Sequence, residues 1–450
     1  MENKREDLLI KSPVELMFKL CIPAIIGMTV IGLYSFMDGV FAGQMIGKEA
    51  MAAISIAYPL TLFNSGISTL VGIGSASILS RAIGKKDNNA INKIMGNLIA
   101  NVLLFSTIVM IVGIVFTRPL LQISGAQGEI LNLGVRYLKI VFLGSIFVNF
   151  AQSANMVMRG EGKMKEAMLI MGFGALLNIV LDPILIKAFG DKGIEGAAVA
   201  TILSQIIQAI ITLVYFKKKS KKVKINKIKL EKDLRGEMFS VGISAMMMQV
   251  FTIIQQTLLY RMAFKYGGNT QAILMGASLR IQAFSFIPIW GMSQGLQPVV
   301  GTNYGAEKFN RVKRATNVFI LGSTILALVF WIPIQVMPSK VLGLFIKDTP
   351  IVLSGISNFR IFYSIFPLYG ALIMMITFFQ SIGNGKSAGK LVLLRQIILY
   401  VPAIILIPTI FGLPAVWFTQ PLVDFIVILL GFVLLFKEYS KMQRELGVQI

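Results

Sequence analysis

Histidine is absent from this chain of 450 residues, and cysteine occurs only once, as Cys21. The missing imidazole excludes histidine acid–base catalysis, histidine proton relays and histidine metal ligands. A single thiol excludes an internal disulfide framework and most thiolate metal sites. Charged residues are also scarce: they make up 14% of the chain, whereas soluble proteins have about 25%. These absences argue against an enzyme, and we expect no catalytic residue and no cofactor.

Apolar residues are what the chain has in abundance, at 55% of the sequence and a mean hydropathy of +0.75. Apolar runs of about 20 residues are long enough to cross a bilayer as helices. We therefore expect an all-α polytopic membrane protein with twelve transmembrane helices. The predicted helices are 14–41, 50–80, 94–117, 130–158, 166–189, 194–216, 237–264, 270–300, 315–336, 350–380, 388–411 and 413–436.

The N-terminal segment MENKREDLLIKSPVE is too charged for a cleavable signal peptide, so we expect the first apolar segment to stay in the membrane. The net charge is +22. With the N-terminus inside, the inner segments carry 30 Lys and Arg and the outer loops seven. This asymmetry follows the positive-inside rule and predicts that both termini are cytoplasmic. The basic run 217–229 then anchors to the membrane surface, and we expect no nucleic-acid partner.

An internal repeat divides the chain at that basic run. A shift of 221 residues aligns Gly74 with Gly295 and Gly84 with Gly305. The repeat predicts two pseudo-symmetric six-helix lobes related by an axis along the membrane normal. Two such lobes normally face each other around a cavity, which favours a transporter. The predicted domains are an N-terminal lobe at 1–216, a basic cytoplasmic linker at 217–235 and a C-terminal lobe at 236–450.

Four polar residues in helices 1, 5 and 6 are predicted to lie at one depth: Asp38, Asn178, Asp182 and Thr201. Asn178 is one helical turn before Asp182, on the same face. Pro183 has no N–H for the carbonyl of Ile179, which loosens that turn. A carboxylate at the centre of a spanning helix costs about 2.5–3.5 kcal/mol. Because these helices offer no basic partner at that depth, the two acids should hold a proton or bind a cation.

A structural hydrogen-bond network between helices is the alternative, and it suits Asn178 and Thr201. The repeat places Val401 and Ile405 at the positions of Asn178 and Asp182, so the predicted cation site belongs to the N-terminal lobe alone. Asp424 is the only acid predicted to lie well inside a helix of the second half. It could form a second, weaker cation site, but we favour a structural pair with Arg395.

Pro23 lies in the same helix as Asp38. One interpretation is that the helix bends at Pro23 when a cation binds. A static kink is the other.

The chain resembles the multidrug and toxic compound extrusion (MATE) family, in its DinF-like bacterial branch. The resemblance covers essentially the whole chain. It rests on the acid of helix 1, the Asn-x-x-x-Asp-Pro of helix 5, LQPVVGTNYGAEKFNRVKR at 296–314 and SILSRAIGKKD at 77–87. In this branch the acids of the N-terminal lobe are expected to bind H+ or Na+, with no other metal. Drug contacts would fall on Tyr34, Gln152 and Asn155.

The resemblance implies export of small cationic, amphipathic drugs in exchange for H+ or Na+, by alternating access. It also implies a multi-pass monomer in the plasma membrane of a bacterial cell. A lipid-linked precursor flippase of the same superfamily is the nearest alternative, but such proteins usually carry more helices and a cationic cavity. A channel fits a site confined to one lobe less well than a carrier does.

Overall fold

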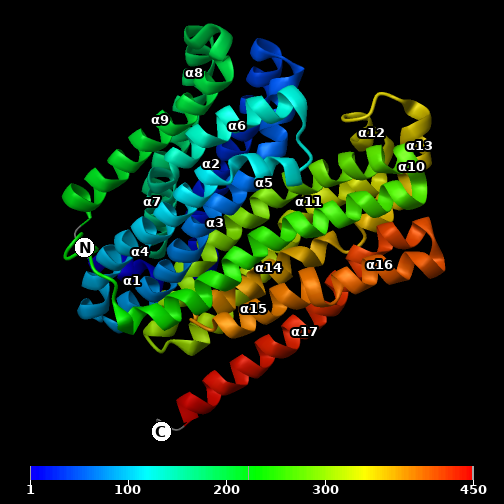
Figure 1. Cartoon of the computed structure of the whole chain (residues 1–450). Coiled ribbons are helices and arrows are strands. Elements are labelled where there is room, and N and C mark those ends of the chain that lie inside the picture. Colours follow the sequence, from blue (N-terminus) through cyan, green and yellow to red (C-terminus); the bar gives the residue numbers. More distant parts are fainter. Residues whose placement is uncertain (1, 221, 448–450) are drawn as a thin grey trace. The chain divides into compact units, whose positions relative to one another are not determined.

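Each predicted apolar segment is helical, as one helix or as consecutive ones, in the computed structural model, which describes residues 2–220 and 222–447 (Figure 1). Side chains are described throughout these ranges except at 2–5, 34–36, 39 and 445–447. No strand occurs in this part of the chain. The predicted all-helical fold is therefore confirmed.

Within these described residues, eight helical segments are apolar and long enough to cross a membrane, and two bent helix pairs bring the number to ten. One of the ten, Met164–Lys219, holds the helices α8 (Met164–Phe189) and α9 (Gly193–Val214). Another, α10 (Lys232–Gly305), is interrupted at Gly268, whose φ of 64° suits glycine. Counting these two segments as two helices each gives the twelve helices that the sequence predicts.

The chain forms two compact units by its internal contacts, one of residues 26–246 and one of residues 1–25 with 247–450. The first boundary falls inside α2 (Pro13–Phe41), two residues after Pro23, and the second falls inside α10. The predicted lobes have different bounds because they rest on the repeat, and they stay a prediction. α2 is continuous through Pro23, so a bend linked to cation binding also stays a prediction.

The unit of residues 26–246 is built around α3, the most buried of its spanning helices. Gly66 to Ser80 of α3 form an almost unbroken buried run, as expected for a helix surrounded by others. Besides the rest of α2 and the start of α10, the unit of residues 26–246 contains η1 (Ala42–Ile46), α3 (Lys48–Lys85), α4 (Asn88–Val115), α5 (Thr117–Ile123), α6 (Gly128–Leu143), α7 (Ser145–Gly160), α8, η2 (Gly190–Lys192), α9 and η3 (Tyr215–Lys219).

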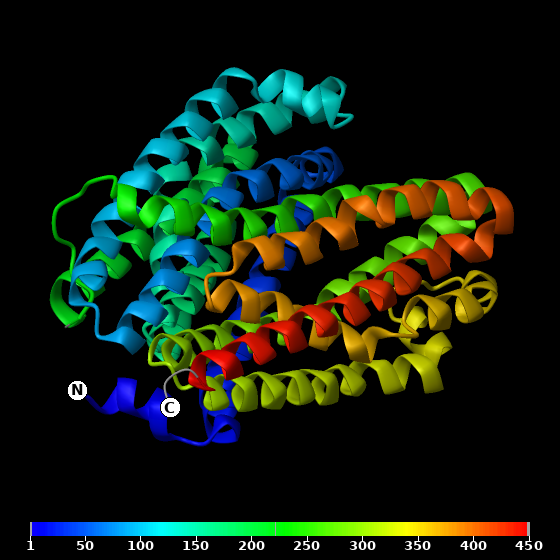
Figure 2. The same cartoon turned by 90° about the horizontal axis from the view of Figure 1, so that it is seen from below.

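The unit of residues 1–25 and 247–450 holds the remaining helices. Asn384 caps α15 and Gly412, with φ 67°, ends α16, so the predicted division at Gly412 is confirmed. The red helix α17 runs beside the yellow-green α11 in Figure 2. Besides parts of α2 and α10, this unit of residues 1–25 and 247–450 contains α1 (Glu2–Ile10), α11 (Phe309–Val336), α12 (Pro338–Gly343), α13 (Thr349–Phe362), α14 (Phe366–Ser381), α15 (Gly385–Leu393), η4 (Leu394–Ile398), α16 (Tyr400–Phe411) and α17 (Leu413–Gly447).

The basic segment 222–231 contains no helix and packs along the start of α4, where Asn226 donates to the carbonyl oxygen of Asn92 and the Glu231 N–H donates to Asn97. A Cβ atom on Gly96 of α4 would lie 2.0 Å from the carbonyl oxygen of Lys227, so only glycine permits this approach. Lys93 of α4 pairs with Asp233 at 2.8 Å and with Glu231 at 3.9 Å. The segment is therefore held to its own unit by close backbone packing and by polar contacts.

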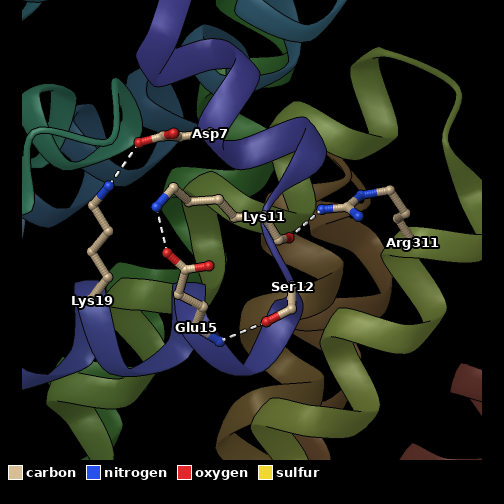
Figure 3. A network of polar contacts seen from close by, with 6 residues as sticks. All are labelled: Asp7, Lys11, Ser12, Glu15, Lys19 and Arg311. Atoms are coloured by element: carbon tan, nitrogen blue, oxygen red, sulfur yellow. Dashed lines mark hydrogen bonds and ion pairs between the residues drawn. The ribbon is translucent and has the colours of Figure 1, made fainter.

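The N-terminal helix α1 is fastened to the start of α11 by Arg311 (Figure 3). The Arg311 guanidinium donates to the carbonyl oxygen of Lys11 at 2.7 Å, and to those of Leu8 and Ile10 at 3.5 and 3.4 Å. These are carbonyls at the C-terminal end of α1, which have no partner within the helix. We call this set of contacts the Arg311 clasp.

Two ion pairs flank the Arg311 clasp in Figure 3: Lys19 with Asp7 at 2.7 Å, and Lys11 with Glu15. The hydrogen bond to Glu15 raises the pKa of Lys11 above its usual value. Both pairs are solvent-exposed, so each contributes little stability by itself.

Asn303 also donates to the carbonyl oxygen of Leu8 at 2.9 Å, and Lys308 to that of Leu9 at 3.4 Å. Arg311 therefore shares the fixing of the turn between α1 and α2 with two neighbours.

Candidate functional site

Three helices of the unit 26–246 carry the four predicted cation-site residues. Asp38 comes from α2, Asn178 and Asp182 from α8, and Thr201 from α9. Asn178 and Asp182 are almost completely buried, and Thr201 is 5% exposed. The structure brings Asn178, Asp182 and Thr201 into contact, and Asp38 is close enough to act on Asp182 electrostatically.

The close approach of α8 and α9 depends on Gly196. A Cβ atom on Gly196 of α9 would lie 2.5 Å from the carbonyl oxygen of Leu185 on α8, so a larger residue would force the helices apart. Small residues at such positions allow close packing of spanning helices. Further along α9, Thr201 contacts the side chain of Asn178 on α8. Figure 1 shows the two green helices side by side.

Asn178 links the other two members of the α8–α9 cluster. In one amide orientation its Nδ2 lies 3.4 Å from Asp182 Oδ1 and 3.5 Å from Thr201 Oγ1. In the opposite orientation its nitrogen donates to Asp182 Oδ2 at 3.1 Å, and its oxygen accepts from the Thr201 backbone N–H at 3.2 Å. The second orientation satisfies both ends of the amide, and we assign it on that ground.

Asp38 provides the second carboxylate. Its Oδ1 is buried and accepts no hydrogen bond from the described residues. No ion pair within the described part of the chain involves either Asp38 or Asp182. Two neighbouring acids without a basic partner are unfavourable as a doubly charged pair in a poorly hydrated environment. A proton or a small cation between them would relieve that repulsion.

The three residues predicted to contact drugs have different surroundings. The side chain of Tyr34 lies outside the described residues. Gln152 on α7 is half-buried and accepts a hydrogen bond from Ser68 at 2.7 Å. Asn155, one turn further on, is completely buried and donates to the carbonyl oxygen of Ala167 at 2.7 Å. Asn155 thus joins α7 to α8, and the assignment of Gln152 and Asn155 to a drug cavity stays a prediction.

A second buried polar cluster of the same unit was not singled out from the sequence. Asn149 of α7 donates to Ser106 of α4 at 3.0 Å and lies 3.3 Å from the oxygen of Asn64 on α3. All three side chains are buried. In the sequence each asparagine of this cluster is only a polar residue inside an apolar segment. That pattern does not indicate whether the side chain contacts another helix. This cluster holds three helices together without any charge.

In the other unit, Asp424 of α17 is paired with Arg395 of η4. The Arg395 Nε donates to Oδ1 at 2.6 Å and its Nη2 to Oδ2 at 3.2 Å, and both side chains are buried. The Arg395 guanidinium also lies 4.6 Å from the ring centre of Tyr369. This bidentate geometry fits the structural role that we favoured for Asp424.

Comparison with known proteins places this architecture in a family. A model of the MatE family matches residues 23–184 and again residues 244–406. The two matches begin 221 residues apart, the same shift that aligns the glycine pairs of the repeat. The family model therefore recognises each half of the chain separately.

Relatives and solved structures agree with that match. The multidrug export protein MepA of Staphylococcus aureus (strain MRSA252) is 28% identical over 410 residues, which is 90% of this chain and 90% of that protein. A crystal structure of MATE in the bent conformation aligns with a TM-score of 0.92 at 26% identity, covering 98% of this chain and 99% of that one.

A further structure is a MOP superfamily transporter from Pyrococcus furiosus, for which reverse polarity of the binding pocket suggests a different function. It aligns with a TM-score of 0.88 at 26% identity, covering 97% of this chain and 98% of that one. Since the family model matches more than half of the residues, in two copies, the chain belongs to the MatE family of membrane transporters.

Proposed function

We propose that this protein is a multidrug efflux antiporter, which exports cationic amphipathic compounds in exchange for H+ or Na+. Family membership and the similarity to proteins named for multidrug export support the efflux part of this proposal. The pair of acids Asp38 and Asp182 supports the exchange part, and it is the observation that carries the proposal.

The chemistry of the exchange follows from the charges. Two carboxylates in a poorly hydrated site attract one cation strongly, whether it is a proton, Na+ or the charged group of a drug. Asp182 accepts a hydrogen bond from Asn178, and Thr201 offers a hydroxyl oxygen as a further ligand. Na+ would use these oxygen atoms, whereas H+ would sit on one carboxylate.

Alternating access completes the mechanism. Occupancy by H+ or Na+ neutralises the acids, and a cationic drug then loses the charge that holds it. Because ion and drug compete for the same pair of carboxylates, uptake of one promotes release of the other. A change in α2 near Pro23 would accompany the exchange. The alternative of a lipid-linked precursor flippase calls for a cationic cavity, whereas the unpaired charges of this site are acidic.

We further propose that the protein acts as a monomer in the plasma membrane of a bacterial cell, with both termini in the cytoplasm. The excess of Lys and Arg in the segments predicted to face inward supports this orientation.

Transport in proteoliposomes tests the proposal. Purified protein is reconstituted with a fluorescent cationic dye, and a pH gradient or a Na+ gradient is imposed separately. We expect one gradient to drive dye movement, and we expect Asp38→Asn with Asp182→Asn to lower that movement at least tenfold. Asp191→Asn is the control, since Asp191 is an exposed acid of η2 in the same unit. Gradient-driven transport that survives intact in the double variant would overturn the proposal.

A further inference from the structure

A shallow groove lies at the start of α11, on the unit of residues 1–25 and 247–450, far along the chain from the acids of the cation site. Its volume is about 380 Å³. Four polar or basic residues and two apolar ones line it: Asn310, Lys313, Arg314, Asn317, Val318 and Leu321. We call it the α11 groove. No acidic side chain lines it, so it presents a positive surface.

The wall of the α11 groove is held by α17. The Tyr439 hydroxyl donates to Asn317 Oδ1 at 3.2 Å, and Lys313 Nζ lies 5.6 Å from the centre of the Tyr439 ring. Tyr439 itself is 3% exposed and is therefore fixed by packing. Figure 2 shows α11 and α17 running alongside each other in this unit. Two of the lining residues are thus ordered before any ligand arrives.

Among the described residues, no acid pairs with the positive charges of the groove. Neither Lys313 nor Arg314 forms an ion pair with any acid that the structure describes. Arg311 is close enough to repel Arg314, and its own hydrogen bonds go to carbonyl oxygens and an amide rather than to a carboxylate. Such a cluster attracts an anion.

The internal repeat supplies a comparison for Arg314. The 221-residue shift relates Arg314 of α11 to Lys93 of α4. Lys93 is paired with Asp233 at 2.8 Å and lies 3.9 Å from Glu231. The charge of Lys93 is thus neutralised by acids of the chain, whereas Arg314 at the related position forms no ion pair with a described acid.

The same face of α11 continues as an apolar stripe. Leu321, Ile325 and Ile332 follow Arg314 at spacings that keep them within about 20° of one line along the helix. Leu321 is 62% exposed and Ile325 is 56% exposed, and Ile332 and Val329 are exposed as well. A basic, polar groove that leads into an exposed apolar stripe matches the two ends of a lipid molecule.

We propose that the α11 groove binds one anionic phospholipid, with its phosphate against Lys313 and Arg314 and an acyl chain along Leu321 and Ile325. The segment 308–314 carries four of the 30 Lys and Arg of the inner segments and is therefore predicted to face the cytoplasm, where membranes carry their anionic lipids. Since Lys313 lies over the Tyr439 ring, the lipid phosphate would be connected to α17 through Lys313. This inference does not depend on the proposed transport activity.

Native mass spectrometry of the full-length protein in detergent tests the inference. The probes are a phosphatidylglycerol, a phosphatidylethanolamine with the same acyl chains, and inorganic phosphate. We expect the wild type to retain one phosphatidylglycerol in preference to phosphatidylethanolamine. We expect Lys313→Gln with Arg314→Gln to weaken phosphatidylglycerol binding about tenfold or more, since each charge near a membrane surface contributes appreciably.

The control is Lys218→Gln with Lys219→Gln, which removes two exposed charges of η3 outside the groove and should change binding less than twofold. Leu321→Ala with Ile325→Ala keeps the charges and removes part of the apolar stripe, and it should weaken lipid binding several-fold. Gel filtration shows whether each variant is folded. Equal loss in both charge variants would overturn the proposal, as would displacement of the lipid by inorganic phosphate. Unchanged binding in the two groove variants would do so too.

Discussion

The amide of Asn178 bridges Asp182 on its own helix and Thr201 on the next, at 3.1 Å from Asp182 Oδ2 and 3.2 Å from the Thr201 backbone nitrogen. This arrangement orients one oxygen of the Asp182 carboxylate and leaves the other for a cation. It also ties the position of Asp182 to the packing of α8 against α9. The proposed cation site therefore depends on a neutral residue as much as on its acids.

Replacing Asn178 by leucine should change cation binding without removing an acid. If the ion is H+, Asp182 should bind it more tightly, because the charged carboxylate loses a hydrogen bond; if it is Na+, binding should weaken, because the carboxylate loses its orientation. A hydrogen bond to a charged group contributes about 1.5–3 kcal/mol, which corresponds to a change of roughly 10- to 100-fold in affinity. We expect the ion concentration for half-maximal dye efflux to shift by at least tenfold. Val180→Ala is the control, because Val180 lies two residues on and is largely exposed. An unchanged concentration dependence in Asn178→Leu would remove Asn178 from the site.

Replacing Gly196 by valine should separate α9 from α8. The added side chain would meet the backbone at Leu185, and overpacking of this kind typically costs about 1–3 kcal/mol. We expect a lower melting temperature in detergent together with reduced efflux. Gly172→Ala is the matched control on α8, since a Cβ atom there meets nothing within 4 Å. Equal melting temperatures for the wild type and Gly196→Val would contradict the assigned packing.

The sequence predicted the helices well, and it singled out residues that the structure brings together at Asp182, both for a physical reason. A bilayer demands long apolar runs, so the predicted helix 166–189 matches α8 at Met164–Phe189 closely. An acid in such a run is costly enough to stand out, and the helical period then places Asn178 on the same face as Asp182. Arg395 and Asp424 were recognisable on the same ground.

Bends and close approaches were not predictable, because they depend on tertiary packing. The predicted helix 130–158 is two helices, α6 and α7, which meet at Gly144 with a bend of 55°. A Cβ atom on Gly144 would lie 2.8 Å from Ile202 of α9. The sequence around Gly144 does not indicate that α9 lies so close. For the same reason the sequence could not tell that Asn155 contacts the backbone of α8.

Replacing Arg311 by leucine should release α1 from the start of α11. The Arg311 clasp donates to the carbonyl oxygens of Leu8, Ile10 and Lys11. Water would have to replace it at Ile10 and Lys11, whereas Leu8 keeps a hydrogen bond from Asn303. We expect trypsin to cut near Lys11 at least tenfold faster, as followed by mass spectrometry of the N-terminal fragments. Arg444→Leu is the control, because it removes an exposed positive charge at the end of α17 in the same unit. A cutting rate equal to that of the wild type would show that α1 is held by other contacts.

The Arg395–Asp424 pair gives a test that separates structure from ion coupling. Removing one partner leaves a buried charge without compensation, so we expect Arg395→Met alone to destabilise the protein by about 3–5 kcal/mol. Replacing both, as Arg395→Met with Asp424→Leu, should recover most of that loss, because apolar residues of similar volume can substitute for a buried ion pair. Unfolding in detergent at increasing denaturant concentration measures each variant.

Transport by the same double variant then distinguishes the two roles of Asp424. If Asp424 only neutralises Arg395, the stable double variant should retain gradient-driven dye efflux close to that of the wild type. Loss of efflux in a double variant of normal stability would instead make Asp424 a second coupling acid. The electrostatics favour the first outcome, since Arg395 already donates to both oxygens of the Asp424 carboxylate and leaves little attraction for a further cation.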